Sequence, residues 1–245
     1  FVRNSKNTLA VKNMSFQVKA GEILGVAGVE GNGQTELMEA LTGLAPIQSG
    51  EILFKGNSLM HSSTAQMRAM GIRHIPEDRM ATGASLQASI KENLIIDNDD
   101  RKPFISPTGF LNWENIQTHS QNLINQFGII AQGPDTIVGN LSGGNLQKVV
   151  VAREISGAHT CLLVSHPTRG LDIGASEFIY EQLLASRDDM KAVMMISADL
   201  DEIFLLSDRI LVIYEGSVVA EFLPNTVTPE ELGLYMTGAK KPLID

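Results

Sequence analysis

The segment Gly28-Val29-Glu30-Gly31-Asn32-Gly33-Gln34-Thr35 lies between an apolar run at residues 23–27 and a helix-like run at residues 36–41. This order predicts a strand, a glycine-rich turn and a helix. Glycines let the backbone curl tightly and turn its N–H groups inward. There, together with the N-terminus of the helix, they can bind phosphate oxygens. The segment therefore predicts a phosphate-binding loop for a nucleotide.

One position of this loop departs from the usual pattern. A Lys normally precedes the Ser or Thr and neutralises the β- and γ-phosphates, but this chain has Gln34 there. Gln34 can donate hydrogen bonds, yet it carries no charge. Thr35 keeps a hydroxyl that could face a magnesium ion. We expect a loop with the shape of a nucleotide site and less electrostatic attraction for phosphate.

Composition limits the classes of function that fit the chain. The 245 residues include 19 Lys and Arg against 28 Asp and Glu, a net charge of −9 without a dense basic run, which argues against a nucleic-acid surface. No apolar run approaches the ~20 residues that a membrane-spanning helix needs. The lone Cys161 lies in an apolar run and is expected to be a structural residue in a reducing cytosol. The sequence begins at Phe1 without a Met, so we expect it to be part of a longer protein.

Strand-like and helix-like segments alternate on both sides of a more polar middle region, which predicts an α/β fold with a mainly parallel sheet. The alternating residues from Leu9 to Val18 predict a strand of an N-terminal antiparallel β layer. Residues 80–145 are expected to form an inserted helical subdomain, with helices at 89–96 and 116–127. Between these helices, the charged run at 97–103 is expected to be a solvated loop.

A second glycine-containing helix start follows this region, at Leu141-Ser142-Gly143-Gly144-Asn145-Leu146-Gln147-Lys148. Ser142 is a favourable N-cap, and the two glycines leave the start of the helix uncovered. The pattern indicates a second helix terminus that can receive an anion. By itself, Ser-Gly-Gly before a helix is more often a plain turn.

Four segments in this order, at 28–35, 141–147, 161–172 and 196–201, resemble the ATP-binding cassette domain of ABC transporters. The resemblance covers nearly the whole chain, and its most specific element is the family's signature sequence at 141–148. The motifs at 76–79, 134–135 and 167–172 look like the branch that imports sugars and nucleosides. The loop Val-Glu-Gly-Asn-Gly-Gln and the run at 133–136 are similar to the second cassette of the fused ATPase subunit of bacterial purine-nucleoside importers.

The resemblance implies the P-loop NTPase core of ABC ATPases as the fold, and a role for each matching residue. Residues 1–79 and 146–225 would form the nucleotide core and β layer, 80–145 the helical subdomain, and 226–245 a C-terminal tail. The residues that would bind the phosphates of ATP are Gly28, Gly31, Asn32, Gly33, Gln34 and Thr35. The signature residues would be Ser142, Gly143, Gly144, Asn145 and Gln147. Glu77 stands at the Q-loop position and Asp172 at the D-loop position. The family often stacks adenine on an aromatic residue before the phosphate loop, and residues 4–7 hold none.

Several catalytic positions of the family are not kept. Ser165 replaces the aspartate that holds the Mg²⁺ shell, His166 replaces the catalytic Glu, and Ala198 replaces the switch His. Phosphoryl transfer depends on positioning and charge neutralisation, so these losses together remove most of the catalytic contributions. Unperturbed histidine side chains have a pKa of ~6.5, which would suit a base. Without a carboxylate at 165, however, we expect His166 to fill a vacated space.

The signature sequence and Asp172, in contrast, are intact. We therefore expect this cassette's own site to be degenerate, with Mg²⁺ weak or absent, while its signature closes over ATP held by a second cassette, expected in the same full-length chain. Transmembrane permease subunits would be further partners, which implies the cytoplasmic face of the cell membrane. The alternative is a regulatory module that senses ATP and does not hydrolyse it. A third reading, an ABC protein acting on ribosomes or DNA, is disfavoured by the negative charge.

Calorimetry with ATP tests the predicted phosphate loop. Because the glycines and Thr35 are retained without Lys, we expect the isolated domain to bind ATP, measured with and without magnesium. Binding in the micromolar range would show that the loop suffices without a cation. No detectable heat at millimolar ATP would contradict the prediction and leave the loop as scaffold.

Overall fold

The computed structural model describes residues 1–3, 6–96 and 102–244. It divides into two compact units. Unit 1 comprises Phe1–His74, Thr160–His166 and Leu183–Asp245, and unit 2 comprises Ile75–His159 and Pro167–Gln182. Most of the charged run expected to be a solvated loop, residues 97–101, lies outside the described residues, as do residues 4 and 5 of the run without an aromatic.

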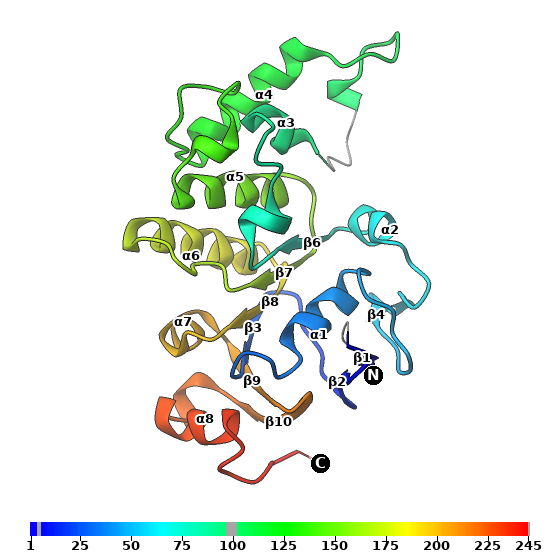
Figure 1. The fold of residues 1–245 in the computed structure, drawn as a ribbon, viewed down its shortest axis with the longest axis vertical. Helices are drawn as coiled ribbons and strands as arrows, with labels where there is room; N and C mark the ends of the chain where they lie inside the picture. The colour runs from blue at the N-terminus through cyan, green and yellow to red at the C-terminus, as the bar shows by residue number, and fades with distance from the viewer. Residues whose placement is uncertain (4–5, 97–101, 245) are drawn as a thin grey trace. The chain divides into compact units, whose positions relative to one another are not determined.

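The elements follow one another in an α/β order (Figure 1). The strands are β1 (Val2–Arg3), β2 (Leu9–Val11), β3 (Glu22–Ala27), β4 (Leu53–Phe54), β5 (Asn57–Ser58), β6 (Ile72–Ile75), β7 (Cys161–Ser165), β8 (Ala192–Ser197), β9 (Arg209–Tyr214) and β10 (Ser217–Phe222). The helices are α1 (Gln34–Leu41), α2 (Thr64–Ala69), α3 (Ile90–Ile95), α4 (Trp113–Gln126), α5 (Gly143–Ser156), α6 (Ile173–Asp188), α7 (Leu200–Leu206) and α8 (Pro229–Met236). Short turns of other helix types lie at η1 (Arg79–Gly83), η2 (Lys102–Phe104), η3 (Val138–Asn140) and η4 (Pro224–Thr226).

A six-stranded sheet in the order β10-β9-β3-β8-β7-β6 forms the centre of the fold. Strand β3 pairs in parallel with β8 and β9, and β7 pairs in parallel with β8. Strand β10 is antiparallel to β9 because a tight turn joins them. The prediction of a mainly parallel sheet is confirmed.

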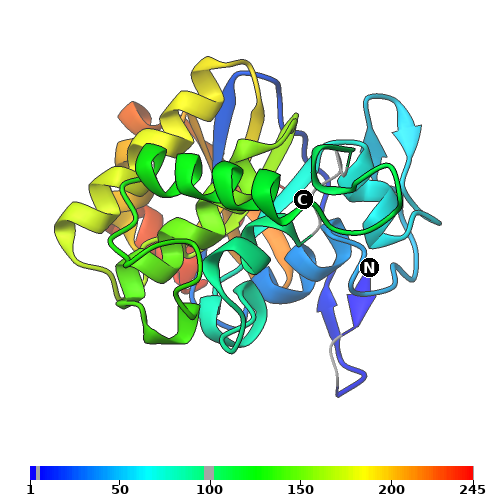
Figure 2. The same cartoon turned by 90° about the horizontal axis from the view of Figure 1, so that it is seen from above.

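The two faces of this sheet are covered by different helices of unit 1. Leu24 and Val26 of β3 belong to a buried apolar cluster that also contains residues of α1. Gly25, between them, points the other way, because a Cβ at this position would meet Ser207 and Ile203 at the end of α7. Figures 1 and 2 show α1 and α7 on opposite sides of the strands. Helix α8, within the region expected to be a tail, packs against β9.

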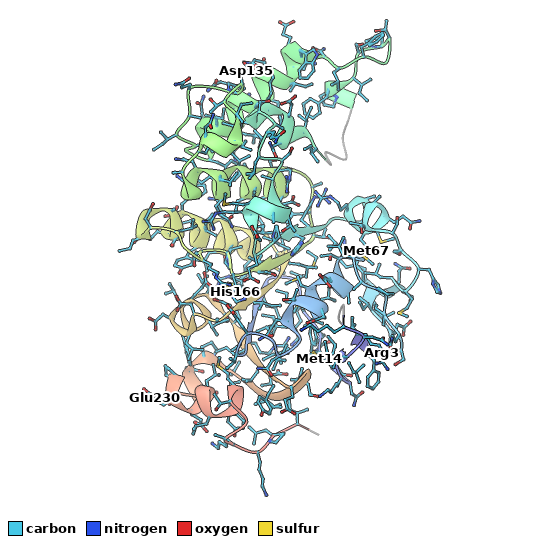
Figure 3. The ribbon with its side chains drawn as sticks, viewed as in Figure 1. Arg3, Met14, Met67, Asp135, His166 and Glu230 are labelled. Carbon is cyan, nitrogen blue, oxygen red and sulfur yellow. The ribbon has the colours of Figure 1, made fainter. Side chains whose placement is uncertain are left out.

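The predicted strand from Leu9 to Val18 is shorter in the structure. Only Leu9–Val11 is a strand, paired antiparallel with β1, and Asn13 has a left-handed φ of 45° that ends the extended run. The alternation nevertheless identified side chains that turn inward, since Met14, Phe16 and Val18 pack partly buried against the apolar cluster. Figure 3 labels Met14 and Met67 of this unit.

Unit 2 is built mainly from helices that pack on one another, α3 on α4 and α5, with α6 entering the unit at its N-terminal end. Side-chain caps determine where the helices α3 and α4 begin. Ser89 caps α3 in a capping box with Glu92, and its hydroxyl donates to Oε2 of Glu92 at 2.6 Å, which lowers the pKa of that carboxyl. Asn112 caps α4 and moves its start to Trp113, ahead of the predicted Ile116. Along the described chain, no helix combines the length and apolar character that crossing a membrane requires.

A glycine pair tests the packing of unit 1 below the phosphate loop. Gly216 and Gly56 both have left-handed backbones, with φ of 80° and 79°. A Cβ on Gly216 would lie 2.1 Å from the carbonyl oxygen of Ala10, whereas a Cβ on Gly56 meets nothing within 4 Å. We expect Gly56→Ala to lower the free energy of unfolding by about 1 kcal/mol and Gly216→Ala by about 3 kcal/mol, measured by urea unfolding. Equal losses would contradict this close approach.

Candidate functional site

The predicted phosphate loop has the expected strand, turn and helix in unit 1. It leaves β3 at Ala27 and enters α1 at Gln34, and Gly31 and Gly33 take left-handed φ values of 88° and 95° that favour glycine. The backbone N–H of Leu37 donates to the carbonyl of Gly33, the N-cap residue, as the first turn of the helix requires. The predicted glycines therefore serve the turn itself.

Asn32 fixes this loop to the turn between β9 and β10. Its Oδ1 accepts from the backbone N–H of Glu215 at 2.7 Å, and its carbonyl accepts from Gly216 at 3.1 Å. Its Nδ2 donates to the carbonyl of Val29 at 2.9 Å. Since one side chain bonds both the start of the loop and the β9–β10 turn, Asn32 shapes the loop, and its side-chain atoms are already engaged within unit 1.

Gln34 turns its side chain into its own loop. Its Nε2 donates to the carbonyl of Val29 at 2.9 Å, and a Cβ on Gly28 would lie 2.7 Å from that nitrogen. The residue is only 7% exposed, and its buried Oε1 has no hydrogen-bond partner among the described residues. Thr35, the next residue, is exposed. The loop interior is thus lined by an uncharged amide that is engaged with the loop's backbone.

His166 and Ala198, at the two positions matched to the catalytic Glu and the switch His, are neighbours in unit 1. Nδ1 of His166 accepts from the backbone N–H of Ala198 at 3.3 Å, which in a neutral ring places the proton on Nε2. His166 has a left-handed φ of 45° and follows Ser165, the buried last residue of β7. Figure 3 labels the His166 side chain.

The residues at these positions suit Mg²⁺ poorly. Magnesium prefers carboxylate and phosphate oxygens in an octahedral arrangement, and position 165 offers a hydroxyl. Within residues 1–3, 6–96 and 102–244, no group of three or more His, Cys, Asp or Glu side chains could hold a metal ion. Cys161 offers no substitute chemistry, since burial raises the pKa of its thiol to about 12. We therefore derive no magnesium-dependent step in this loop.

The signature segment begins helix α5 in unit 2, and Ser142 is its N-cap, as predicted. Oγ of Ser142 accepts from the backbone N–H of Asn145 at 3.4 Å and from its Nδ2 at 2.9 Å. Oδ1 of Asn145 in turn accepts from the N–H of Ile130 at 2.8 Å, which fixes the orientation of the amide. A hydroxyl has two acceptor positions and one proton, so the O–H of the exposed Ser142 remains free to donate to a ligand.

Asp172 and Gln147 connect the signature segment with residues 167–172. Oδ1 of Asp172 accepts from the N–H of Ala175 at 2.9 Å at the start of α6, and its Oδ2 lies 3.8 Å from a Cβ built on Gly144. Gln147 is 2% exposed and donates from Nε2 to the carbonyl of Pro167 at 2.9 Å. The structure therefore brings the predicted signature and D-loop residues together within unit 2.

Glu77, at the Q-loop position, is engaged in unit 2 in a way that the sequence did not reveal. Its Oε1 pairs with Nη1 of Arg169, and the carbonyl of Arg169 accepts from Nη1 of Arg79 at 2.8 Å. These three residues, with Asp78 and Met80, line an open cavity of 390 Å³. Arginines at 79 and 169 were visible in the sequence, but the ninety or so residues between them gave no signal of their contact.

Comparison with solved structures identifies the class of fold. A dimeric bacterial ABC transporter cassette matches 88% of this chain and 90% of its own, with a TM-score of 0.74 and 19% identity. An ATP-binding cassette of an ABC transporter in its ADP conformation matches 95% of this chain and 91% of its own, with a TM-score of 0.71 and 19% identity. The fold is that of an α/β P-loop NTPase.

The sequence comparisons narrow this class. Residues 11–169 match the ABC transporter family, and the chain belongs to that family. It is 42% identical to the nucleoside import ATP-binding protein NupA of Lactococcus lactis subsp. cremoris, over 97% of this chain and 47% of that protein. It is 41% identical to the guanosine import ATP-binding protein NupO of Bacillus subtilis, over 97% of this chain and 46% of that protein. The chain thus spans about half the length of these curated relatives.

Replacing Gln34 tests whether its amide limits nucleotide binding. Gln34→Lys supplies an ammonium where the loop now holds a neutral amide, so we expect the Kd for ATP to fall about tenfold in calorimetry. Gln34→Met is the matched control, with similar length but neither charge nor donor, and we expect no gain in affinity. An equal gain from both variants would show that the amide blocks the loop sterically. No gain from Lys would contradict the electrostatic explanation.

Proposed function

We propose that this chain is the nucleotide-binding domain of an ATP-driven importer for nucleosides or simple sugars. Its relatives are named for the import of nucleosides, guanosine, glucose and ribose. Identity is 42% with the nucleoside protein and 41% with the guanosine protein, against 40% with the glucose import ATP-binding protein TsgD13 of Haloferax volcanii and 37% with a ribose import ATP-binding protein RbsA of Bacillus licheniformis. A nucleoside is therefore the substrate class we favour. Since these relatives are about twice as long as the chain, the second cassette is proposed to lie in the same protein.

The proposed division of labour is that this cassette's own loop is degenerate and its signature serves the partner. The free O–H of Ser142 carries this proposal, because its two acceptor positions are both used by Asn145. This O–H and the amides of Gly143 and Gly144, at the positive end of α5, would donate to phosphate oxygens of ATP on the partner's loop. Such fixed donors favour the charge that develops during phosphoryl transfer.

The same residues suggest why this cassette's own loop contributes little to hydrolysis. Gln34 supplies no positive charge, Ser165 no metal-binding carboxylate, and Nδ1 of His166 already accepts a hydrogen bond. Glu77 and the neighbouring cleft would contact the permease subunits, which places the chain at the cytoplasmic face of the membrane. Phosphate binding through Gly28, Gly31, Gly33 and Thr35 would retain ATP without turning it over.

A second candidate is an ATP-sensing module that takes no part in hydrolysis. The retained glycine turn and the exposed Thr35 favour it, since both suit nucleotide binding by this chain alone. The two candidates differ in one respect. Only the first requires the signature of this chain for the ATPase rate of the whole protein.

Substitution of Ser142 in the full-length protein separates these candidates. Ser142→Gly removes the hydroxyl but costs the helix only a few tenths of a kcal/mol, because glycine is an acceptable N-cap. We expect the ATPase kcat of the assembled transporter to fall about tenfold or more, as for loss of one donor to a transition state. Ser142→Thr keeps the O–H and should retain most of the activity. An unchanged rate in Ser142→Gly would exclude signature donation and favour the sensing module.

A further inference from the structure

Arg79 lies where three segments of unit 2 meet. It is the first residue of η1, and its Nη1 donates to the carbonyl of Arg169 at 2.8 Å. A Cβ built on Gly143 would lie 2.9 Å from its Nη2, and one built on Gly170 would lie 3.8 Å from the same atom. The guanidinium therefore bonds the turn that leads to α6, and its Nη2 occupies the space that a side chain on Gly143, at the start of the signature helix, would need.

Arg79 leaves no room for a side chain at Gly143. Real Cβ atoms do not approach another heavy atom as closely as the 2.9 Å that separates Nη2 of Arg79 from a Cβ on Gly143. A side chain at 143 would therefore displace the guanidinium. The Nε of Arg79 is buried without a hydrogen-bond partner among the described residues. A buried donor left unpaired costs free energy, so the position of this side chain is not explained by its own hydrogen bonding.

Glu77 forms a second contact with the turn that contains Arg169. It pairs with Nη1 of Arg169, and the two side chains are 37% and 55% exposed. An ion pair this exposed contributes little to stability. Its geometry matters more, because Glu77 and Arg79, two residues apart, hold the side chain and the carbonyl of one arginine. Movement of segment 77–79 would thus be passed to Arg169.

This turn is itself connected with the signature. Gln147 of α5 donates to the carbonyl of Pro167, and Asp172 lies beside Gly144. The segments at 77–79, 142–147 and 167–172 therefore form one block of contacts inside unit 2. None of these contacts involves the phosphate loop of unit 1.

We propose that Arg79 is a positioning residue for the signature, and that Glu77 acts through Arg169 to hold the same block. This rests on the proposed function, because the block matters for hydrolysis only if the signature is donated to the partner's ATP. The guanidinium fits this role since one of its nitrogens bonds the carbonyl of Arg169 while another fills the space beside Gly143, which the single ammonium of a lysine cannot reproduce. Glu77 thereby serves the partner's site from its own unit.

The test uses the full-length protein assembled with its transporter subunits, measuring ATPase kcat and KM for ATP. Arg79→Ala should lower kcat about tenfold and leave KM within about twofold, because ATP binds first to the partner's loop. Arg79→Lys should behave like Arg79→Ala. Asp135→Asn, which removes the ion pair between the exposed Asp135 and Lys91 elsewhere in unit 2, is the control and should leave kcat unchanged. Figure 3 labels Asp135.

A charge exchange covers the case in which Arg79→Ala fails to fold. Glu77→Arg and Arg169→Glu each place like charges together and should each lower kcat several-fold. The double variant restores an opposite pair and should return kcat to within about twofold of the starting protein. Recovery of kcat in the double variant supports the positioning role. If the two residues acted independently, the decreases in kcat of the single variants would instead add in the double variant. Additive losses would overturn it.

Combination with Ser142→Gly separates failure of this inference from failure of the proposed function. If Arg79 acts through the signature, Arg79→Ala should add little further loss to a protein that already carries Ser142→Gly. If Ser142→Gly lowers kcat while Arg79→Ala leaves it unchanged, only the positioning role is wrong. If neither variant changes kcat, signature donation itself is wrong.

Discussion

The close meeting of three backbone segments at the carbonyl of Ala10 is the constraint on which unit 1 depends. Gly33 of the phosphate loop and Gly216 of the β9–β10 turn both approach this oxygen so closely that neither position has room for a Cβ. Asn32 then bonds the loop to the same turn. The backbone segments around the loop therefore hold its shape.

Backbone contacts hold the loop, and two side chains at positions matched to functional residues of the family form hydrogen bonds of their own. Gln34 satisfies its Nε2 on the carbonyl of Val29, and His166 satisfies its Nδ1 on the N–H of Ala198. Each replacement forms a neutral hydrogen bond where the family has a charged or reactive group. Both side chains are thus held by hydrogen bonds within unit 1, and the proposed degeneracy of this site would leave the structure of the loop unchanged.

Unit 2 shows the opposite arrangement, with polar groups kept available. Asn145 occupies both acceptor positions of Ser142 and leaves its proton free, and Arg79 abuts Gly143 without bonding to the signature backbone. The start of α5 is thus shaped by side chains that lie beside and behind it. The exposed O–H of Ser142 is the donor that the proposed signature donation would use.

The order of residues alone determined the class of fold, the glycine turn, the N-cap of α5 and the family, because each of these depends on local spacing. It also identified Met14, Phe16 and Val18 as inward-facing, although the strand expected there ends at Val11 once Asn13 adopts a left-handed backbone. Only the tertiary structure decided that Gln34 folds into its own loop, and that Glu77, Arg79 and Arg169 converge. The contacts of Arg169 join residues 90 and 92 positions apart in the chain, and local sequence patterns carry no information about which distant partner a side chain will meet.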